Sequence, residues 1–173
     1  MTGIRLFSGL ADYLTMNISS PNTPGLRSMQ TGDQLERMLD SVKNAQSLQK
    51  NYVPLLVKVA PDLNLENAEY MCEKIKEYEL DGVIATNTTL DRPPNLVQNE
   101  EGGLSGRPLF EKSLEILRLF RRHLHPNCPV VGVGGISDKE KAETFLNNGA
   151  DLIQVYTGFV YKGTKIVQNI SRL

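Results

Sequence analysis

Five short runs of apolar and β-branched residues recur along the chain and predict buried strands. The runs are Tyr13–Ile18, Pro54–Ala60, Gly82–Asn87, Pro129–Gly134 and Leu152–Tyr156. Strict alternation of polar and apolar positions is weak in all five, which is typical of parallel strands covered on both faces. The pattern therefore favours a parallel sheet.

The segments between these runs carry apolar residues at helical spacing. They predict helices over Asp33–Gln49, Leu65–Tyr78, Phe110–His123, Ser137–Asn148 and Thr164–Leu173. Asp33 with Glu36, and Ser137 with Glu140, have the spacing of a capping box. Gly149 follows the fourth helix in a position that favours helix termination.

Strands and helices alternate throughout, which predicts right-handed βαβ units in an α/β fold. An open doubly wound sheet fits the 173 residues directly, whereas a (β/α)8 TIM barrel takes about 250 residues and fits only if three units are absent. All five predicted strands end in polar or glycine-containing segments. In a barrel all carboxyl ends of the strands meet at one site, so this distribution favours the barrel.

Composition excludes several classes of protein. Hydrophobic residues make up 40% and charged residues 23%, which is typical of a globular chain. The net charge of −1 gives no basic excess for nucleic acid. No apolar run is long enough to span a bilayer, and the N-terminal segment MTGIRLFSG lacks the apolar core of a secretory signal. The two cysteines make no disulfide framework and suit a reducing compartment.

Lys58 lies inside the apolar run LLVKVAP. Lysine is almost never fully buried without a partner, so one interpretation is a fixed cation that faces an anionic ligand or cofactor. The alternative is a lysine at a sheet edge whose side chain reaches water.

Glycine-containing turns follow the last two predicted strands. The turn Gly132–Gly135 precedes a predicted helix, where glycine allows close backbone approach and free N–H groups can bind a phosphate. Tight turns between strand and helix also take glycine for structural reasons. Tyr156, Thr157 and Gly158 occupy the matching place in the next unit, and barrels often build phosphate sites from their last two loops. A phosphate-bearing ligand is therefore expected.

Neutral polar side chains gather after the first and third strands. They are Asn17, Asn22, Thr86, Asn87 and Thr88. Such groups can bind imide or carboxamide edges, although asparagine and threonine are also common in turns. Two asparagine-bearing strand ends beside a buried lysine favour the binding interpretation.

Ser20 is a candidate nucleophile or base in the segment after the first strand. No GxSxG motif surrounds it, and His123 and His125 lie together at a helix end, so no Ser-His-Asp arrangement is indicated. No spacing of His, Cys and carboxylate residues resembles a metal site.

Six motifs in order carry a family resemblance. They are NISSPNTPGLR, KVAPDL, DGVIATNTTLDRP, GGLSGRPL, VVGVGGI and GADLIQVYTGF. From about Leu10 onward the chain closely resembles the membrane-associated, quinone-dependent dihydroorotate dehydrogenases. The resemblance implies an FMN-containing (β/α)8 barrel that acts in pyrimidine synthesis. Residues 1–173 are then one partial FMN-binding barrel domain that contains about strands four to eight.

The resemblance also implies roles for individual residues. Ser20 matches the catalytic base, which removes a proton from C5 of dihydroorotate while a hydride passes from C6 to the flavin. Serine in place of cysteine at this position marks the quinone-dependent class. Thr23, three residues later, is a candidate proton relay, directly or through water. The substrate-binding matches are Asn17, Asn22, Asn87 and Thr88, and the FMN-binding matches are Asn17, Lys58, Thr86, Gly106, Gly134, Gly135, Tyr156 and Thr157.

The chain departs from the family pattern at its start. The SSPN loop follows the fourth barrel strand in the family but begins near residue 17 here. We therefore expect a partial sequence or alternative product, in which three barrel units, the helical pair at the quinone entrance and the membrane segment are missing. Met1–Gly9 resembles the end of the helix before strand four.

The implied partners are dihydroorotate and orotate, ubiquinone or another quinone, and a membrane reached through the missing N-terminal region. The implied location is the mitochondrial inner membrane in a eukaryote, or the cytoplasmic face of the inner membrane in a bacterium. Two alternatives stay open. One is another FMN barrel oxidoreductase with a cysteine base and fumarate or NAD as acceptor, and the other is an inactive barrel remnant.

Overall fold

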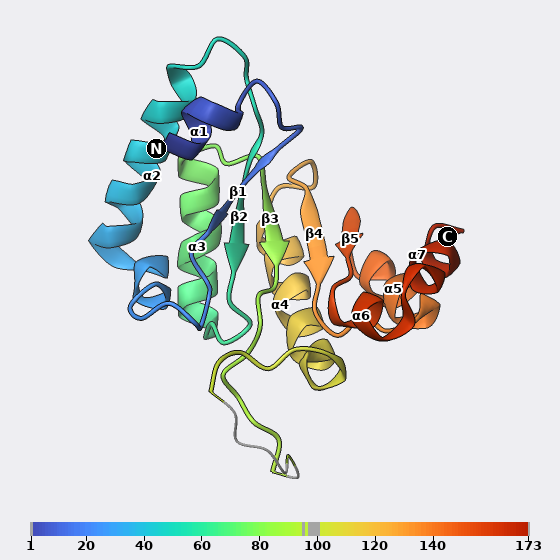
Figure 1. The fold of residues 1–173 in the computed structure, drawn as a ribbon. Coiled ribbons are helices and arrows are strands. Elements are labelled where there is room, and N and C mark those ends of the chain that lie inside the picture. The colour runs from blue at the N-terminus through green and yellow to red at the C-terminus, as the bar shows by residue number, and fades with distance from the viewer. Residues whose placement is uncertain (1, 95, 97–100, 173) are drawn as a thin grey trace.

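The computed structural model describes residues 2–94, 96 and 101–172, which form a five-stranded sheet with helices between the strands (Figure 1). The strands are β1 Leu14–Asn17, β2 Leu55–Val59, β3 Gly82–Ala85, β4 Val130–Val133 and β5 Leu152–Gln154. The α-helices are α1 Thr2–Phe7, α2 Gly32–Ser47, α3 Leu65–Glu77, α4 Phe110–His123, α5 Lys139–Asn147, α6 Thr157–Lys162 and α7 Thr164–Ile170. Two short 3-10 helices are η1 Arg27–Gln30 and η2 Arg107–Leu109.

All neighbouring strands pair in parallel, and their spatial order β1-β2-β3-β4-β5 is their order along the chain (Figure 1). A doubly wound sheet reverses its strand order at a switch point, and the order here has no reversal. The sheet therefore has the arrangement of consecutive strands in a barrel. The predicted parallel α/β architecture is confirmed, and it is consistent with part of a TIM barrel.

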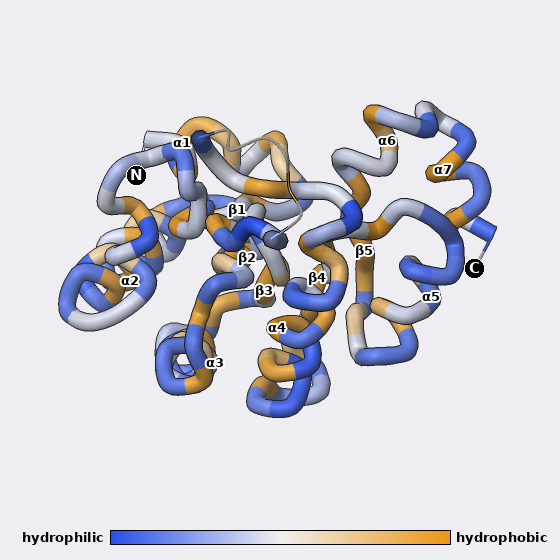
Figure 2. Tube along the Cα trace, turned by 90° about the horizontal axis from the view of Figure 1, so that it is seen from below, coloured by the Kyte–Doolittle hydropathy of each residue, from blue (hydrophilic) through white to orange (hydrophobic). Residues whose placement is uncertain are grey.

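The main core lies between the sheet and the helices that connect its strands. Figure 2 shows α2, α3 and α4 on one side of the strands, with apolar positions directed toward the sheet. Alternate strand residues such as Val57, Val59 and Val83 belong to this core and are completely buried, as are Leu117 and Phe120 of α4. Because every strand alternates its side chains between two faces, this packing fixes which residues point the other way.

The opposite face of the sheet is also apolar in its central strands. It carries a small separate cluster of Leu56, Ile84 and Val131, with Val133 packed against it. The three residues of this cluster are at most 7% exposed, so the central strands are buried on both faces, as their apolar sequence pattern predicts. Such inner-face packing is the arrangement found inside a barrel.

The helix termini differ in detail from the two predicted capping boxes. Helix α5 begins after Asp138, whose side chain accepts a hydrogen bond from the Lys141 N–H at 3.0 Å. Ser137 lies one residue too early to cap it and donates to Asp138 instead. Helix α2 follows Thr31, which makes no capping hydrogen bond through its side chain. Both predictions were wrong because the helices start one or two residues away from the expected positions.

Two short helices show where the periodic pattern is weak. Helix α6 was not predicted, because it has no buried residue and so no apolar stripe. Helix α7 ends at Ile170, earlier than expected, and Leu173 lies outside the described residues. Among the described residues, no helix is both long and apolar enough to cross a membrane.

The two outer strands, β1 and β5, leave the sheet open at both sides. Large apolar side chains are exposed in the segments along them. Those near β1 are Leu6, Phe7, Leu10 and Tyr13, and those in or after β5 are Leu152, Tyr156, Val160 and Tyr161. The described chain thus has apolar surface beside both open strands.

Candidate functional site

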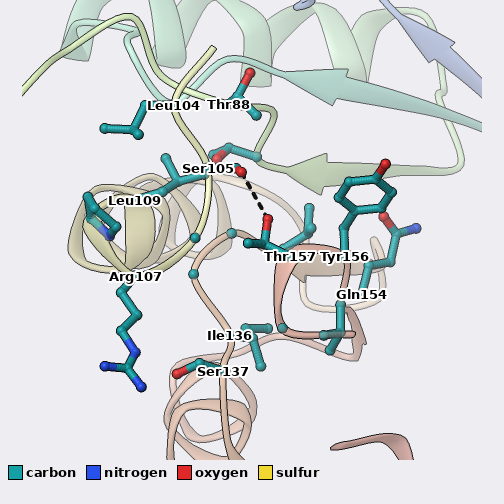
Figure 3. Close-up of a pocket in the computed structure, with 18 of the residues that line it drawn as sticks. Thr88, Leu104, Ser105, Arg107, Leu109, Ile136, Ser137, Gln154, Tyr156 and Thr157 are labelled. Atoms are coloured by element: carbon teal, nitrogen blue, oxygen red, sulfur yellow. Dashed lines mark hydrogen bonds between the residues drawn. The ribbon is translucent and has the colours of Figure 1, made fainter. Parts of the chain in front are cut away.

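A cavity of about 820 Å³ lies at the carboxyl ends of the strands. It is lined by one residue each of β2, β4 and β5, by the loops after β3, β4 and β5, by the 103–109 segment and by α6. Figure 3 shows Thr88 and Leu104 at one end, and Arg107 with Ser137 at the other. This volume falls in the range of about 300–1,000 Å³ that is usual for cofactor and small-molecule sites.

The structure brings nine of the twelve predicted site residues to this one cavity. They are Lys58, Thr86, Asn87, Thr88, Gly106, Gly134, Gly135, Tyr156 and Thr157. The other three, Asn17, Ser20 and Asn22, lie in β1 and the loop that follows it, outside the cavity lining.

Asn87 connects the β1 loop to the cavity. Its Nδ2 donates to Asn17 Oδ1 and to Ser19 Oγ, both at 3.1 Å. Its Oδ1 accepts from the Thr88 N–H at 2.8 Å, which fixes the orientation of the amide. The segment carrying Ser20 therefore lies directly beside the loop after β3, although 68 residues separate Ser19 from Asn87.

Ser20 is half-buried, and its Oγ accepts a hydrogen bond from the Asn22 N–H at 3.3 Å. Asn22 and Thr23 are exposed, and the Thr23 carbonyl accepts from the Leu26 N–H at 3.2 Å. No direct hydrogen bond joins Thr23 to Ser20 in the described part of the chain. A relay through Thr23 would therefore need an intervening water, and it stays a prediction.

Lys58 points away from the helical core and toward the cavity. Its neighbours Val57 and Val59 face the helices and are completely buried, so alternation places Lys58 on the opposite face. Strand β2 lies between β1 and β3, which excludes the interpretation of a lysine at a sheet edge. Within the described residues its ammonium has no hydrogen-bond or ion-pair partner.

Burial lowers the pKa of Lys58 from its ordinary value, because the charged form loses hydration without gaining a partner. A half-buried cation without a counter-ion is an unusual arrangement for a packed strand. An anionic or electron-rich ligand in the cavity would provide the missing partner.

Thr86 is buried, and its hydroxyl is already engaged within the protein. Thr86 Oγ1 donates to the Asn87 carbonyl at 2.9 Å and lies 2.8 Å from Ser113 Oγ of α4. Because a hydroxyl carries one proton, Ser113 is the donor in the second contact. These bonds hold the start of the β3 loop against α4.

Gly134 and Gly135 are required by the packing of the β4 loop against α4. Their φ values are +126° and +73°, a region that side chains disfavour. A Cβ at Gly134 would lie 2.1 Å from Ser113 Oγ, and one at Gly135 would lie 2.5 Å from Phe110 Cα. In the described chain, the N–H groups of Gly135 and Ile136 have no protein acceptor, so they are available to a ligand.

The cavity includes polar residues that sequence reasoning missed. Ser105 Oγ accepts a hydrogen bond from Thr157 Oγ1 at 2.9 Å, which joins the 103–109 segment to the start of α6 (Figure 3). Ser105 and Arg107 flank the predicted Gly106, so that motif offered a signal for both. Lys162 donates to the Ser137 carbonyl at 2.6 Å, and no local pattern indicated this contact.

The model of the dihydroorotate dehydrogenase family matches residues 1–173, which is the whole chain. The chain belongs to the dihydroorotate dehydrogenase family. Proteins named dihydroorotate dehydrogenase (quinone) are similar to it. The one from Idiomarina loihiensis is 51% identical over 166 residues, and the one from Cronobacter sakazakii is 50% identical over 169 residues. In each case the match covers 92% of this chain and 50% of the relative.

Solved structures of the Eimeria tenella dihydroorotate dehydrogenase have the same fold. The ferulenol complex gives a TM-score of 0.92 and the ligand-free form 0.93, both at 30% identity over 99% of this chain. The matches cover 51% and 53% of those chains. This chain therefore spans about half the length of the dihydroorotate dehydrogenases it matches.

Proposed function

We propose that this chain forms part of an enzyme that oxidises dihydroorotate to orotate, with FMN as hydride acceptor and a quinone as final electron acceptor. The substrate and acceptor are those in the names of its relatives. The pathway would be de novo pyrimidine synthesis, and the quinone acceptor implies work at a quinone-containing inner membrane. The observation that carries the proposal is the meeting of nine expected site residues in one cavity, with an unpartnered lysine among them.

The residues of the cavity fit a flavin mononucleotide. The N–H groups of Gly135 and Ile136, with the Thr157 segment, would hold its phosphate. Lys58 would lie beside the electron-rich edge of the ring, where a cation stabilises negative charge. When bound, FMN supplies the site that accepts a hydride from C6 of the substrate.

Ser20 and the asparagines would handle the substrate. Asn87 and Thr88 line the cavity, and Asn17 is bonded to Asn87, so their amide and hydroxyl groups can bind the polar edges of a pyrimidine ring. Ser20 would take the proton from C5, in the segment next to these groups. A hydroxyl is a weak base at its ordinary pKa, so the proton must pass onward to water or another acceptor.

The alternative enzyme, an FMN barrel with a cysteine base, finds little support in the cysteines of this chain. Cys72 is buried in α3 within the helical core, and burial raises its pKa to about 12. Burial also raises the pKa of Cys128. Both thiols stay protonated near neutral pH, and neither lines the cavity.

The test is a flavin spectrum of the purified 173-residue chain, followed by anaerobic addition of dihydroorotate. We expect bound FMN that bleaches on addition. In Ser20→Ala, flavin should still bind, while bleaching should slow by at least about a hundredfold, since a positioned base contributes about 10²–10⁴.

Ser28→Ala is the matched control, because Ser28 is exposed in η1 and only bonds the Gly25 carbonyl. It should bleach at the rate of the parent. Bleaching of Ser20→Ala at the parental rate would overturn the base assignment. A chain that folds but binds no flavin, or aggregates without colour, would favour the inactive remnant.

A further inference from the structure

A polar cluster beside the cavity joins the loops that follow β1, β2 and β3. At its centre is Asp62, just after β2, with a side chain that is 19% exposed. Asp62 Oδ2 accepts from Arg27 at 2.5 Å and from the Leu90 N–H at 3.0 Å. Its Oδ1 accepts from Thr89 Oγ1 at 2.5 Å and from Lys112 Nζ at 2.6 Å. Donors from three other segments therefore fix this carboxylate in one orientation.

Arg27 links the same loops through their backbones. Its Nε donates to the Ser19 carbonyl at 3.1 Å, and one terminal nitrogen donates to the Thr88 carbonyl at 2.6 Å. The other terminal nitrogen makes the ion pair with Asp62. Ser19 directly precedes Ser20, so one planar guanidinium spans from the backbone beside the predicted base to the backbone of a predicted substrate ligand.

The cluster is charged and mostly shielded from water. Burial by itself would raise the pKa of Asp62, but the hydrogen bonds from Lys112, Thr89, the Leu90 N–H and Arg27 outweigh it and hold the pKa at about 2. The Arg27 side chain is 18% exposed. Partial burial strengthens these charge-assisted bonds compared with an exposed pair.

We propose that Arg27 and Asp62, together called the clamp, are positioning residues that hold the Ser20 loop and the Thr88 loop at a fixed separation. Neither loop is a strand or helix at these positions, so the sheet alone does not fix their spacing. Chemistry between a base and a bound substrate is sensitive to displacements of about 1 Å. The inference rests on the proposed function, because the loops are those that would carry the base and the substrate.

Arg27→Lys tests the clamp with little change in charge. A lysine can keep the ion pair with Asp62, but it lacks the planar fork that reaches three acceptors. Arg37→Lys is the matched control, because Arg37 is 81% exposed and pairs with Asp33 on the surface of α2.

The first measurement is amide hydrogen exchange in the 173-residue chain without ligand. We expect the Leu26 and Thr89 amides, one in each loop, to exchange at least about fivefold faster in Arg27→Lys, and the β2 amides to be unchanged. Arg37→Lys should match the parent. Equal exchange of both loops in Arg27→Lys and parent would overturn the proposal. If Arg27→Lys fails to fold, Asp62→Glu, which displaces the carboxylate by one methylene, is measured in its place.

The second measurement is flavin reduction at saturating dihydroorotate. Arg27→Lys should slow it at least about tenfold with unchanged flavin content, since the loss is in alignment and not in cofactor binding. Loosened loops with parental reduction would also overturn the proposal. If the parent itself binds no flavin or is not reduced, the proposed function fails, and exchange alone then decides whether the clamp exists.

Discussion

Asp62 makes the stability of this protein depend on pH in acid. Its ordinary pKa is 3.8, and its hydrogen-bonded surroundings hold it at about 2 in the folded chain. A carboxyl group with a lowered folded pKa stabilises the fold above its unfolded pKa, and this stabilisation is lost as pH falls through the folded pKa. The sensitive window therefore runs from about pH 5 down to about pH 2.

The size of the effect follows from the shift. A difference of nearly two pH units, at about 1.4 kcal/mol for each unit, gives about 2 kcal/mol of stabilisation at neutral pH. About half of this is lost by about pH 3. The side chain is only 19% exposed, so solvent screening removes little of it.

The assay is urea unfolding of the parent and Asp62→Asn between about pH 5 and about pH 2, because comparison of the two removes the contributions of all other carboxyl groups. The difference in unfolding free energy should shrink by about 2 kcal/mol over this range. Asp91→Asn is the control, since Asp91 pairs with the same Lys112 but is 73% exposed, and its acid profile should follow the parent. Identical acid profiles for the parent and Asp62→Asn would refute the reasoning.

Three further predictions test the cavity and the core. Lys58→Met should weaken FMN binding at least about tenfold in a flavin titration, since a charge-assisted contact contributes about 1.5–3 kcal/mol. The unfolding free energy, measured in urea, should not fall, because the cation has no protein partner in the described chain. Unchanged FMN affinity would contradict the role of Lys58 in flavin binding. Gly134→Ala should lower the unfolding free energy by at least about 2 kcal/mol, because its Cβ would lie 2.1 Å from Ser113 Oγ. The control is Gly3→Ala in α1, where a Cβ meets nothing within 4 Å, so this variant should raise the unfolding free energy by up to about 1 kcal/mol. Similar thermal unfolding of the two variants would contradict the close packing of Gly134 against Ser113. Phe145→Ala should cost about 3–5 kcal/mol in urea unfolding, because this ring is completely buried, and a loss below about 1 kcal/mol would contradict its place in the core.

Sequence reasoning located every strand and the four longest helices, because these elements leave local signals. The helix Phe110–His123 has the predicted bounds, since its apolar stripe is strong. The sequence did not predict α6, because this helix buries no residue. It also predicted the wrong N-cap for α5, because Ser137 and Asp138 are both favourable N-cap residues and the sequence does not show at which residue the helix begins.

In the candidate site too, the sequence revealed the residues that stand out locally and missed the contacts between distant residues. Lys58 stood out in the sequence because a charge inside an apolar run is unusual, and the glycine turn after β4 stood out by composition. The clamp of Arg27 and Asp62 was missed, since 35 residues separate its partners and neither lies in an unusual local pattern. The need for glycine at 134 likewise depends on Ser113, which belongs to another element.

The sequence by itself determined the alternation of strands and helices, the family motifs and the residue types available for chemistry. These follow from periodicity and local composition, which a single chain segment carries. Only the tertiary structure decided the consecutive strand order, the face on which Lys58 lies and the joining of the β1, β2 and β3 loops through Asp62. Each of these depends on contacts between residues far apart in the chain, which are set by packing of the whole sheet and leave no mark in local sequence.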